Sequence, residues 1–229
     1  MIENQSGNWY DYSLDPLNAV KNYTSTLRAW NEEGTILGAR RRVLITTDPD
    51  ALDLRGFWHE IEECPQLEFL LLAECPETWD DCLPAHWRDT WPGNVRLGFT
   101  AQDQRRWDQR YEAARAFGNR GLPFFVCCDP LVGRIEFMPA TGLVPPEVGW
   151  VIVAGESGPN ARLMCRPWVE SIRDQCQDSG TPFFFKWWGD WFQNNLKGVV
   201  RIKGYWHSGF PHGGDLLAGK RFKEFPDFA

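Results

Sequence analysis

The chain has 229 residues and a formal net charge of -7 at pH 7, which argues against a general clamp on nucleic acid, since that needs a basic surface. Its 43% hydrophobic and 24% charged residues are typical of a globular protein, and no apolar run reaches the length of a membrane span. The first residues lack the apolar core of a signal peptide. We therefore expect a cytoplasmic protein that binds neither long nucleic acid nor a membrane.

The first 40 residues are interpreted as an N-terminal appendage with one short amphipathic helix within 18–34, ending at Gly34. After it, apolar segments typical of strands recur, namely RRVLITT, LEFLLLA, NVRLGFT, PFFVCC, VGWVIVAG and PFFFKWW. These segments end near residues 47, 73, 99, 127, 155 and 186. Their spacing is close to the length of one βα unit, which indicates a repeated strand–helix pattern.

Three of the connecting segments have a helical pattern, at 57–64, 102–118 and 166–180. The third is the clearest, because Pro167 suits the first turn of a helix and Gly180 suits the residue that ends one. The predicted buried faces of the three helices consist of Phe57, Trp58 and Ile61; Trp107, Tyr111 and Ala114; and Trp168, Val169, Ile172 and Cys176.

The predicted strands are nearly continuous apolar runs, which is typical of a parallel sheet covered by helices. Six βα units in sequence suit either an open doubly wound sheet or a partial barrel. The regular spacing favours an α/β fold with a partial parallel (βα)6 barrel in residues 41–195. Residues 196–229 are then expected to be a C-terminal extension that packs on the barrel.

In both architectures the ligand site lies at the carboxyl ends of the strands. Carboxylates are frequent there, so we expect a cationic or polyhydroxylated ligand, or a carboxyl whose pKa is raised towards acid–base use by its neighbours. The alternative is that these carboxylates only cap the following helices. The candidate ligand-binding residues are Asp48, Glu74, Thr100, Asp103, Gly155, Ser157, Gly158, Asn160, Arg162 and Trp188.

The candidate catalytic residues are Glu156, Lys186 and Asp129. Strand alternation in PFFFKWW predicts that Lys186 lies on the same face as Phe184 and Trp188, among aromatic side chains where an ammonium group needs a partner. We expect Glu156, on the neighbouring strand, to be that partner, in a functional or a purely structural pair. Glycines beside Glu156 would let a ligand approach the backbone, and Trp187 or Trp188 would offer a ring for stacking.

From about residue 39 onwards the chain resembles a phage and prophage family of unknown function with a radical-SAM-like barrel. The resemblance rests on RRVLITTDPDAL, LLAECPETW, NVRLGFTAQDQ, FFVCCDPLVGRIEF, the segment from VIVAGESGPN to FFFKWWGDW, and DLLAGKRFKEFPD. It implies a fold similar to radical-SAM and TIM barrels. Five residues fit the family's pattern, namely Asp48, Asp103, Asp129, Glu156 and Lys186.

The chain departs from that family in two places. Typical members begin with three closely spaced cysteines that resemble ligands of a [4Fe–4S] cluster for cleaving S-adenosylmethionine (SAM), whereas this chain has NWYDYSLDPL there and its first cysteine is Cys64. Glu74 and Cys75 also stand where relatives carry a basic pair. We therefore expect no iron–sulfur cluster and no metal, and SAM is retained only as a ligand to be tested.

These observations predict a barrel without a cluster that binds a small nucleotide- or nucleoside-like ligand at the strand ends, as a pseudoenzyme or a non-radical enzyme. An alternative is a phage or mobile-element protein that binds or inhibits a host protein through an acidic surface rich in tryptophan. A third is a radical enzyme with a cluster on unusual cysteines, such as Cys75, Cys127 and Cys128. The first predicts a site with Glu156 and Lys186, the second an exposed aromatic patch, and the third three adjacent cysteines.

Overall fold

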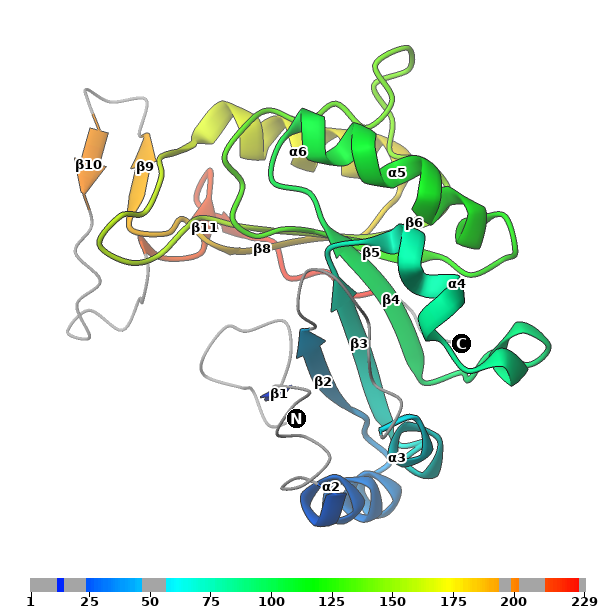
Figure 1. Ribbon diagram of the computed structural model, residues 1–229. Helices are drawn as coiled ribbons and strands as arrows, with labels where there is room; N and C mark the ends of the chain where they lie inside the picture. The colour runs from blue at the N-terminus through cyan, green and yellow to red at the C-terminus, as the bar shows by residue number, and fades with distance from the viewer. Residues whose placement is uncertain (1–11, 15–23, 47–56, 194–198, 202–212, 227–229) are drawn as a thin grey trace. The chain divides into compact units, whose positions relative to one another are not determined.

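A computed structural model of the chain describes residues 12–14, 24–46, 57–193, 199–201 and 213–226 (Figure 1). The chain divides into two compact units, Met1–Phe99 with Ala229, and Thr100–Phe228. Within the described ranges, no helix combines the length and the apolar character that crossing a bilayer requires.

The first unit is built on parallel strands in the order β1, β2, β3, β4. Phe69 of β3 pairs in register with Val43 of β2 and Val95 of β4, and its ring meets Phe57 edge to face at 6.3 Å. This face of the sheet is therefore covered by the segment that starts α3. The elements are β1 (Tyr12–Leu14), α2 (Thr24–Leu37), β2 (Arg41–Thr46), α3 (Trp58–Glu63), β3 (Leu67–Ala73), η1 (Pro76–Thr78), α4 (Trp79–Cys82), η2 (Ala85–Arg88) and β4 (Val95–Thr100).

The second unit contains three parallel strands in the order β5, β6, β8, with α5 and α6 on one face (Figure 1). The outer side of β8 is lined by residues 222–224, because the Phe185 amide donates to the Phe222 carbonyl at 2.9 Å and the Glu224 amide donates to the Phe183 carbonyl at 3.2 Å. The elements are α5 (Gln104–Gly118), β5 (Phe124–Cys128), β6 (Val148–Ala154), β7 (Met164–Cys165), α6 (Arg166–Ser179), β8 (Phe183–Trp187), β9 (Trp191–Gln193), β10 (Val199–Arg201), β11 (Leu216–Leu217) and β12 (Lys220–Arg221).

The predicted parallel α/β character is confirmed. All six predicted strands form, as β2, β3, β4, β5, β6 and β8, and each end lies within one residue of the prediction. Their central residues are almost entirely buried, which explains why a nearly continuous apolar run identified them. The small strands β7, β9, β10, β11 and β12 were not predicted, because two or three residues carry too little pattern.

The three predicted helices also form, as α3, α5 and α6. Gly180 has φ 67° and ends α6 as expected. The prediction that the N-terminal helix ends at Gly34 was wrong, since α2 continues to Leu37 and the residue with positive φ is Gly38. Gly34 is buried, and a Cβ atom there would lie only 3.0 Å from the Ala39 carbonyl and 3.1 Å from Gln66 Cβ. Gly34 is therefore required for close packing inside the unit, and it does not end the helix.

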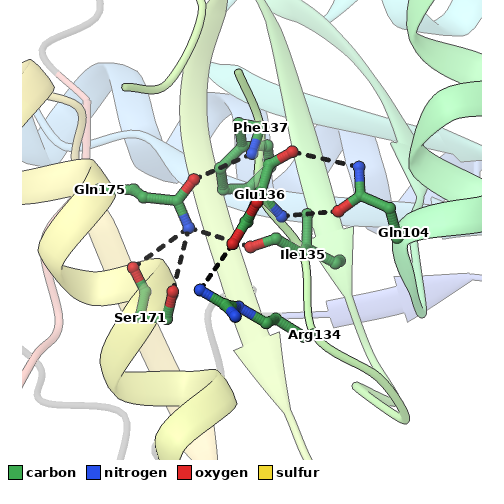
Figure 2. A network of polar contacts seen from close by, with 7 residues as sticks. All are labelled: Gln104, Arg134, Ile135, Glu136, Phe137, Ser171 and Gln175. Carbon is green, nitrogen blue, oxygen red and sulfur yellow. Dashed lines mark hydrogen bonds and ion pairs between the residues drawn. The ribbon is translucent and has the colours of Figure 1, made fainter. Parts of the chain in front are cut away.

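The connection from β5 to β6, residues 129–147, contains no helix, although the predicted repeat of βα units implied one. Its prolines and glycines oppose helix formation, and two glutamines hold its backbone instead. Figure 2 shows residues 135–137 between Gln175 of α6 and Gln104 of α5. Gln175 accepts from the Phe137 amide at 2.9 Å and donates to the Ile135 carbonyl at 2.9 Å, while Gln104 accepts from the Glu136 amide at 2.7 Å. The side-chain amides thus supply the hydrogen bonds that a neighbouring strand would give.

Candidate functional site

The clearest polar arrangement in the second unit joins the carboxyl ends of β5 and β8. The Lys186 ammonium donates to Asp129 Oδ2 at 3.1 Å, and it lies 3.8 Å from the centre of the Trp187 ring. The Lys186 side chain is 7% exposed and that of Asp129 is 25% exposed. A buried ammonium group needs a partner such as this carboxylate, and the ring adds a cation–π attraction. The carboxylate is the part of the pair nearer to solvent.

Lys186 occupies a β-bulge. Val153 of β6 pairs with Phe185 and Ala154 pairs with Trp187, so Lys186 is the additional residue of β8. The bulge breaks the predicted alternation, because Trp188 packs on Phe185 with ring centroids 4.9 Å apart instead of sharing the face of Lys186. Bulges often occur beside functional sites, where they re-aim a side chain, and this one directs Lys186 to Asp129.

The expected pair of Glu156 and Lys186 does not form. Glu156 instead holds Arg162, whose Nε donates to Oε2 at 2.7 Å, whose Nη2 donates to Oε1 at 2.9 Å, and whose backbone amide donates to Oε2 at 2.6 Å. These hydrogen bonds lower the pKa of the Glu156 carboxyl, which is the opposite of the raised pKa expected for acid–base use. The reason is the turn after β6, which brings Arg162 back to the strand end. Glu156 is therefore a loop-forming carboxylate in this structure.

Gly155 has a packing role that the sequence did not indicate. A side chain there would collide with the Trp188 carbonyl, so the space predicted for a ligand holds the turn after β8. Two further bonds tie the turns together, since the Gly158 amide donates to Asp190 Oδ2 at 2.7 Å and the Asp190 amide donates to the Glu156 carbonyl at 2.9 Å. The turns after β6 and β8 are thus held together by hydrogen bonds. Gly158 lies in the first of these turns, and the position of its missing side chain is open space.

Trp188 is 6% exposed, and its indole N–H donates to the Leu216 carbonyl at 2.9 Å. It is thus part of the core and does not offer a stacking face. Trp187 is half-buried, and its indole N–H donates to the Gly155 carbonyl at 3.0 Å, which fixes the ring beside Lys186. Of the two rings considered, Trp187 is the one at the border with solvent.

The carboxyl end of β4 is explained by local structure. Asp103 caps α5 by accepting from the Arg106 amide at 2.9 Å, as the capping alternative predicted. Thr100 binds the buried guanidinium of Arg110, whose Nη1 lies 2.6 Å from both the Thr100 carbonyl and its hydroxyl. Asp103 and Thr100 therefore have structural partners within the unit.

The other candidates are dispersed. Asp48 lies outside the described residues. Glu74 follows β3 in the first unit and is partly buried. Ser157 and Asn160 are exposed on the turn after β6. Of the predicted catalytic set, the structure brings together Asp129 and Lys186 and gives Glu156 another partner.

Sequence reasoning missed Lys223, which lies beside Lys186. The Lys223 ammonium donates to the Phe185 carbonyl at 2.8 Å and to the Lys186 carbonyl at 3.2 Å, and it pairs with Asp215 at 3.4 Å. Asp190 was missed as well, although a Gly-Asp pair directly after a strand is a turn signal that marks the position. Lys223 has no such signal, since its contacts lie 37 and 38 residues away along the chain.

Four of the seven cysteines show the properties of buried apolar residues. Cys64, Cys127, Cys128 and Cys176 are buried, and burial raises the pKa of each of these thiols, that of Cys64 to about 11. Cys127 and Cys128 are consecutive in β5 and therefore point to opposite faces of the sheet. In the part of the chain that the structure describes, no three His, Cys, Asp or Glu side chains are grouped to hold a metal ion.

Residues 17–226 match the model of a family described as protein of unknown function (DUF5131). A search of curated proteins gives no match.

Proposed function

We propose, for a chain that belongs to the DUF5131 family of proteins of unknown function, that the second unit binds a small nucleotide- or nucleoside-like ligand at the carboxyl ends of β5, β6 and β8. The observation that carries the proposal is the buried Lys186, held between Asp129 and the ring of Trp187. We call these three residues the Lys186 site.

The Lys186 site has the features of a recognition site for a base and its polar groups. Trp187 is fixed by its indole bond to Gly155 and is half-buried, so it offers an aromatic surface that loses little conformational freedom on binding. The Asp129 carboxylate is partly exposed and accepts hydrogen bonds from amino or hydroxyl groups. Gly158 leaves an open approach to the backbone of the neighbouring turn.

The chemistry supported best is binding or a polar reaction without radicals, that is, a pseudoenzyme or a non-radical enzyme. Lys186 and Asp129 are the groups able to bind the ligand and to move a proton, since Glu156 is held as a carboxylate by Arg162. The proposed kinship is with radical-SAM-like phage proteins, and the proposed architecture is the partial (βα)6 barrel. In each unit the parallel strands pair in chain order, which supports the proposed architecture.

A thermal-shift screen tests the binding proposal. We expect the melting temperature to rise with at least one of adenosine, AMP, ATP, SAM or S-adenosylhomocysteine, because a ligand that binds the folded state stabilises it. Lys186→Met and Asp129→Asn should each abolish the rise. The matched control is Glu170→Gln, which removes the charged partner of Arg166 in a partly exposed ion pair on α6.

Two outcomes would count against the Lys186 site. If none of the five compounds shifts the melting temperature of the wild-type protein, the proposed ligand class is wrong. If a compound shifts Lys186→Met as much as the wild type, binding occurs elsewhere. A host protein that co-purifies in place of a small molecule would support the alternative function. The structure gives that alternative no specific support, since no tryptophan with a described environment is among the exposed large hydrophobic side chains.

The absence of radical chemistry is tested separately. After anaerobic reconstitution with iron and sulfide we expect colourless protein without bound iron, because the buried thiols are costly to ionise. About four irons per chain after desalting, together with the broad absorbance of a thiolate-bound cluster, would contradict this expectation.

A further inference from the structure

The C-terminal segment contributes a second lysine to the surroundings of the Lys186 site. Phe184 and Lys223 form an antiparallel bridge between β8 and residues 222–224. The Lys223 side chain returns over the strand, and its ammonium lies 4.6 Å from the centre of the Phe184 ring. Its hydrogen bonds to the carbonyls of Phe185 and Lys186 place it at the bulge of β8.

A bulge needs additional hydrogen-bond donors, since the regular ladder between neighbouring strands is interrupted there. The carbonyls that Lys223 binds belong to the last regular residue, Phe185, and to the additional residue, Lys186. One ammonium group with three donors serves both carbonyls and Asp215. Lys223 therefore stabilises the backbone conformation from which the Lys186 side chain leaves the strand.

Partial burial of the charged Lys223 ammonium group is energetically costly, which indicates that its contacts at this position are specific. Its side chain is 23% exposed, and burial lowers the pKa of its ammonium group, with smaller contributions in the same direction from Arg221 and Lys186. Asp215 opposes this effect. A neutral side chain would avoid the burial of a charge but would not donate to two carbonyls and a carboxylate together.

We propose that Lys223 is a positioning residue of the Lys186 site, which holds the β8 bulge and thereby directs Lys186 to Asp129. The ligand-binding consequence rests on the proposed function. The positioning itself does not, since it concerns the protein without a ligand.

Chemical labelling tests the positioning directly. In the full chain, acetic anhydride labelling followed by peptide mass spectrometry should find Lys186 protected, in keeping with its 7% exposure. In Lys223→Met, loss of the bulge conformation should raise the labelling rate of Lys186 by roughly tenfold, which corresponds to about 1.4 kcal/mol of local opening free energy. Lys223→Arg should restore protection, and Lys220→Met, at an exposed lysine of β12, should have no effect.

Three results separate the two proposals. If Lys186 stays protected in folded Lys223→Met, positioning by Lys223 is wrong, whatever binds. If labelling rises but none of adenosine, AMP, ATP, SAM or S-adenosylhomocysteine stabilises the wild type, positioning holds and the proposed function fails. If both hold, Lys223→Met should lose the ligand-induced thermal shift and Lys223→Arg should regain it. Should Lys223→Met not fold, Lys223→Gln replaces it, and protection equal to that of the wild type would then overturn the proposal.

Discussion

Each unit contains an ion pair between residues at the ends of parallel strands, and the two pairs bury opposite partners. In the first unit Arg42 and Glu68 approach to 3.1 Å, and the carboxylate is 4% exposed while the arginine is 28% exposed. In the second unit Lys186 and Asp129 also approach to 3.1 Å, but here the base is 7% exposed and the acid 25% exposed. The first pair lies near the amino ends of β2 and β3, and the second near the carboxyl ends of β5 and β8.

The two pairs show that the role of a buried charged side chain depends on which end of the strands it occupies. Burial raises the pKa of Glu68 to about 7, although Arg42, Arg96 and Arg40 all act to lower it. Lys186 instead has a carboxylate and an aromatic ring within reach. The amino ends of parallel strands contribute mainly to stability, whereas ligand sites lie at the carboxyl ends. This contrast supports a structural role for Glu68 and agrees with the ligand-binding role proposed for Lys186.

Removing the acid of the second pair should have the largest effect. Asp129→Ala removes the carboxylate to which the buried Lys186 ammonium donates, so the free energy of unfolding should fall by roughly 3–5 kcal/mol. Urea unfolding measures the change. Glu170→Ala, which breaks an i,i+4 pair of two partly exposed side chains on α6, should cost about 0.5 kcal/mol or less. A similarly small loss for Asp129→Ala would show that Lys186 reaches water easily.

Titration of the first pair should have the next largest effect. Because the pKa of Glu68 rises from 4.5 to about 7 in the folded state, the folded protein binds this proton more tightly than the unfolded chain does. The stabilisation by the protonated carboxyl is complete below pH 4.5 and is lost as the pH rises through about 7, by roughly 3 kcal/mol in total. Urea unfolding at several pH values should show this slope in the wild type and not in Glu68→Gln. Equal slopes would show that Glu68 stays ionised beside Arg42.

The buried side-chain amide of Gln175 carries no charge, so its removal gives a reference for the stability losses expected at the two ion pairs. Gln175→Ala removes the partners of the Phe137 amide and the Ile135 carbonyl (Figure 2), so stability should fall by roughly 1–3 kcal/mol. Hydrogen exchange at the Phe137 amide should accelerate at the same time. The control is Gln177→Ala, at an exposed position of the same helix. Unchanged exchange in Gln175→Ala would mean that another group protects this amide.

An ion pair with an exposed arginine should show the smallest change in the free energy of unfolding. Arg28 of α2 binds Glu60 of α3 through two bonds of 3.1 and 3.2 Å, but the arginine side chain is 54% exposed. Arg28→Met should therefore change the free energy of unfolding by less than about 1 kcal/mol, and high salt should reduce the difference further. A loss as large as that of Asp129→Ala would remove burial as the explanation of the contrast.

The sequence predicted the regular elements well because burial on both faces of a parallel strand leaves a strong local pattern. The segment PFFFKWW, for example, predicted β8 to within one residue at each end. It could not predict the bulge at Lys186, because that depends on the register between β6 and β8. The prediction therefore placed Trp188 on the wrong face.

The candidate site was only partly predictable for a related reason. Lys186 and Asp129 were identified from their places at strand ends, and the structure brings them together. Their pairing was not predicted, since Glu156 on the neighbouring strand was the expected partner and the turn that brings Arg162 to it has no distinctive pattern. Lys223 acts on backbone carbonyls far away along the chain, and such contacts leave no trace in local composition.

The pairing of β8 with residues 222–224 also sets an order of events during synthesis. The Phe183 amide donates to the Glu224 side chain, 41 residues later in the chain. At a translation rate of 5–20 residues per second, roughly 2–8 s pass between the synthesis of these two residues. During that interval the aromatic strand β8 presents an open edge, and such edges pair readily with other chains. The nascent protein therefore has a period of vulnerability to aggregation, in which a ribosome-associated chaperone would have the greatest effect.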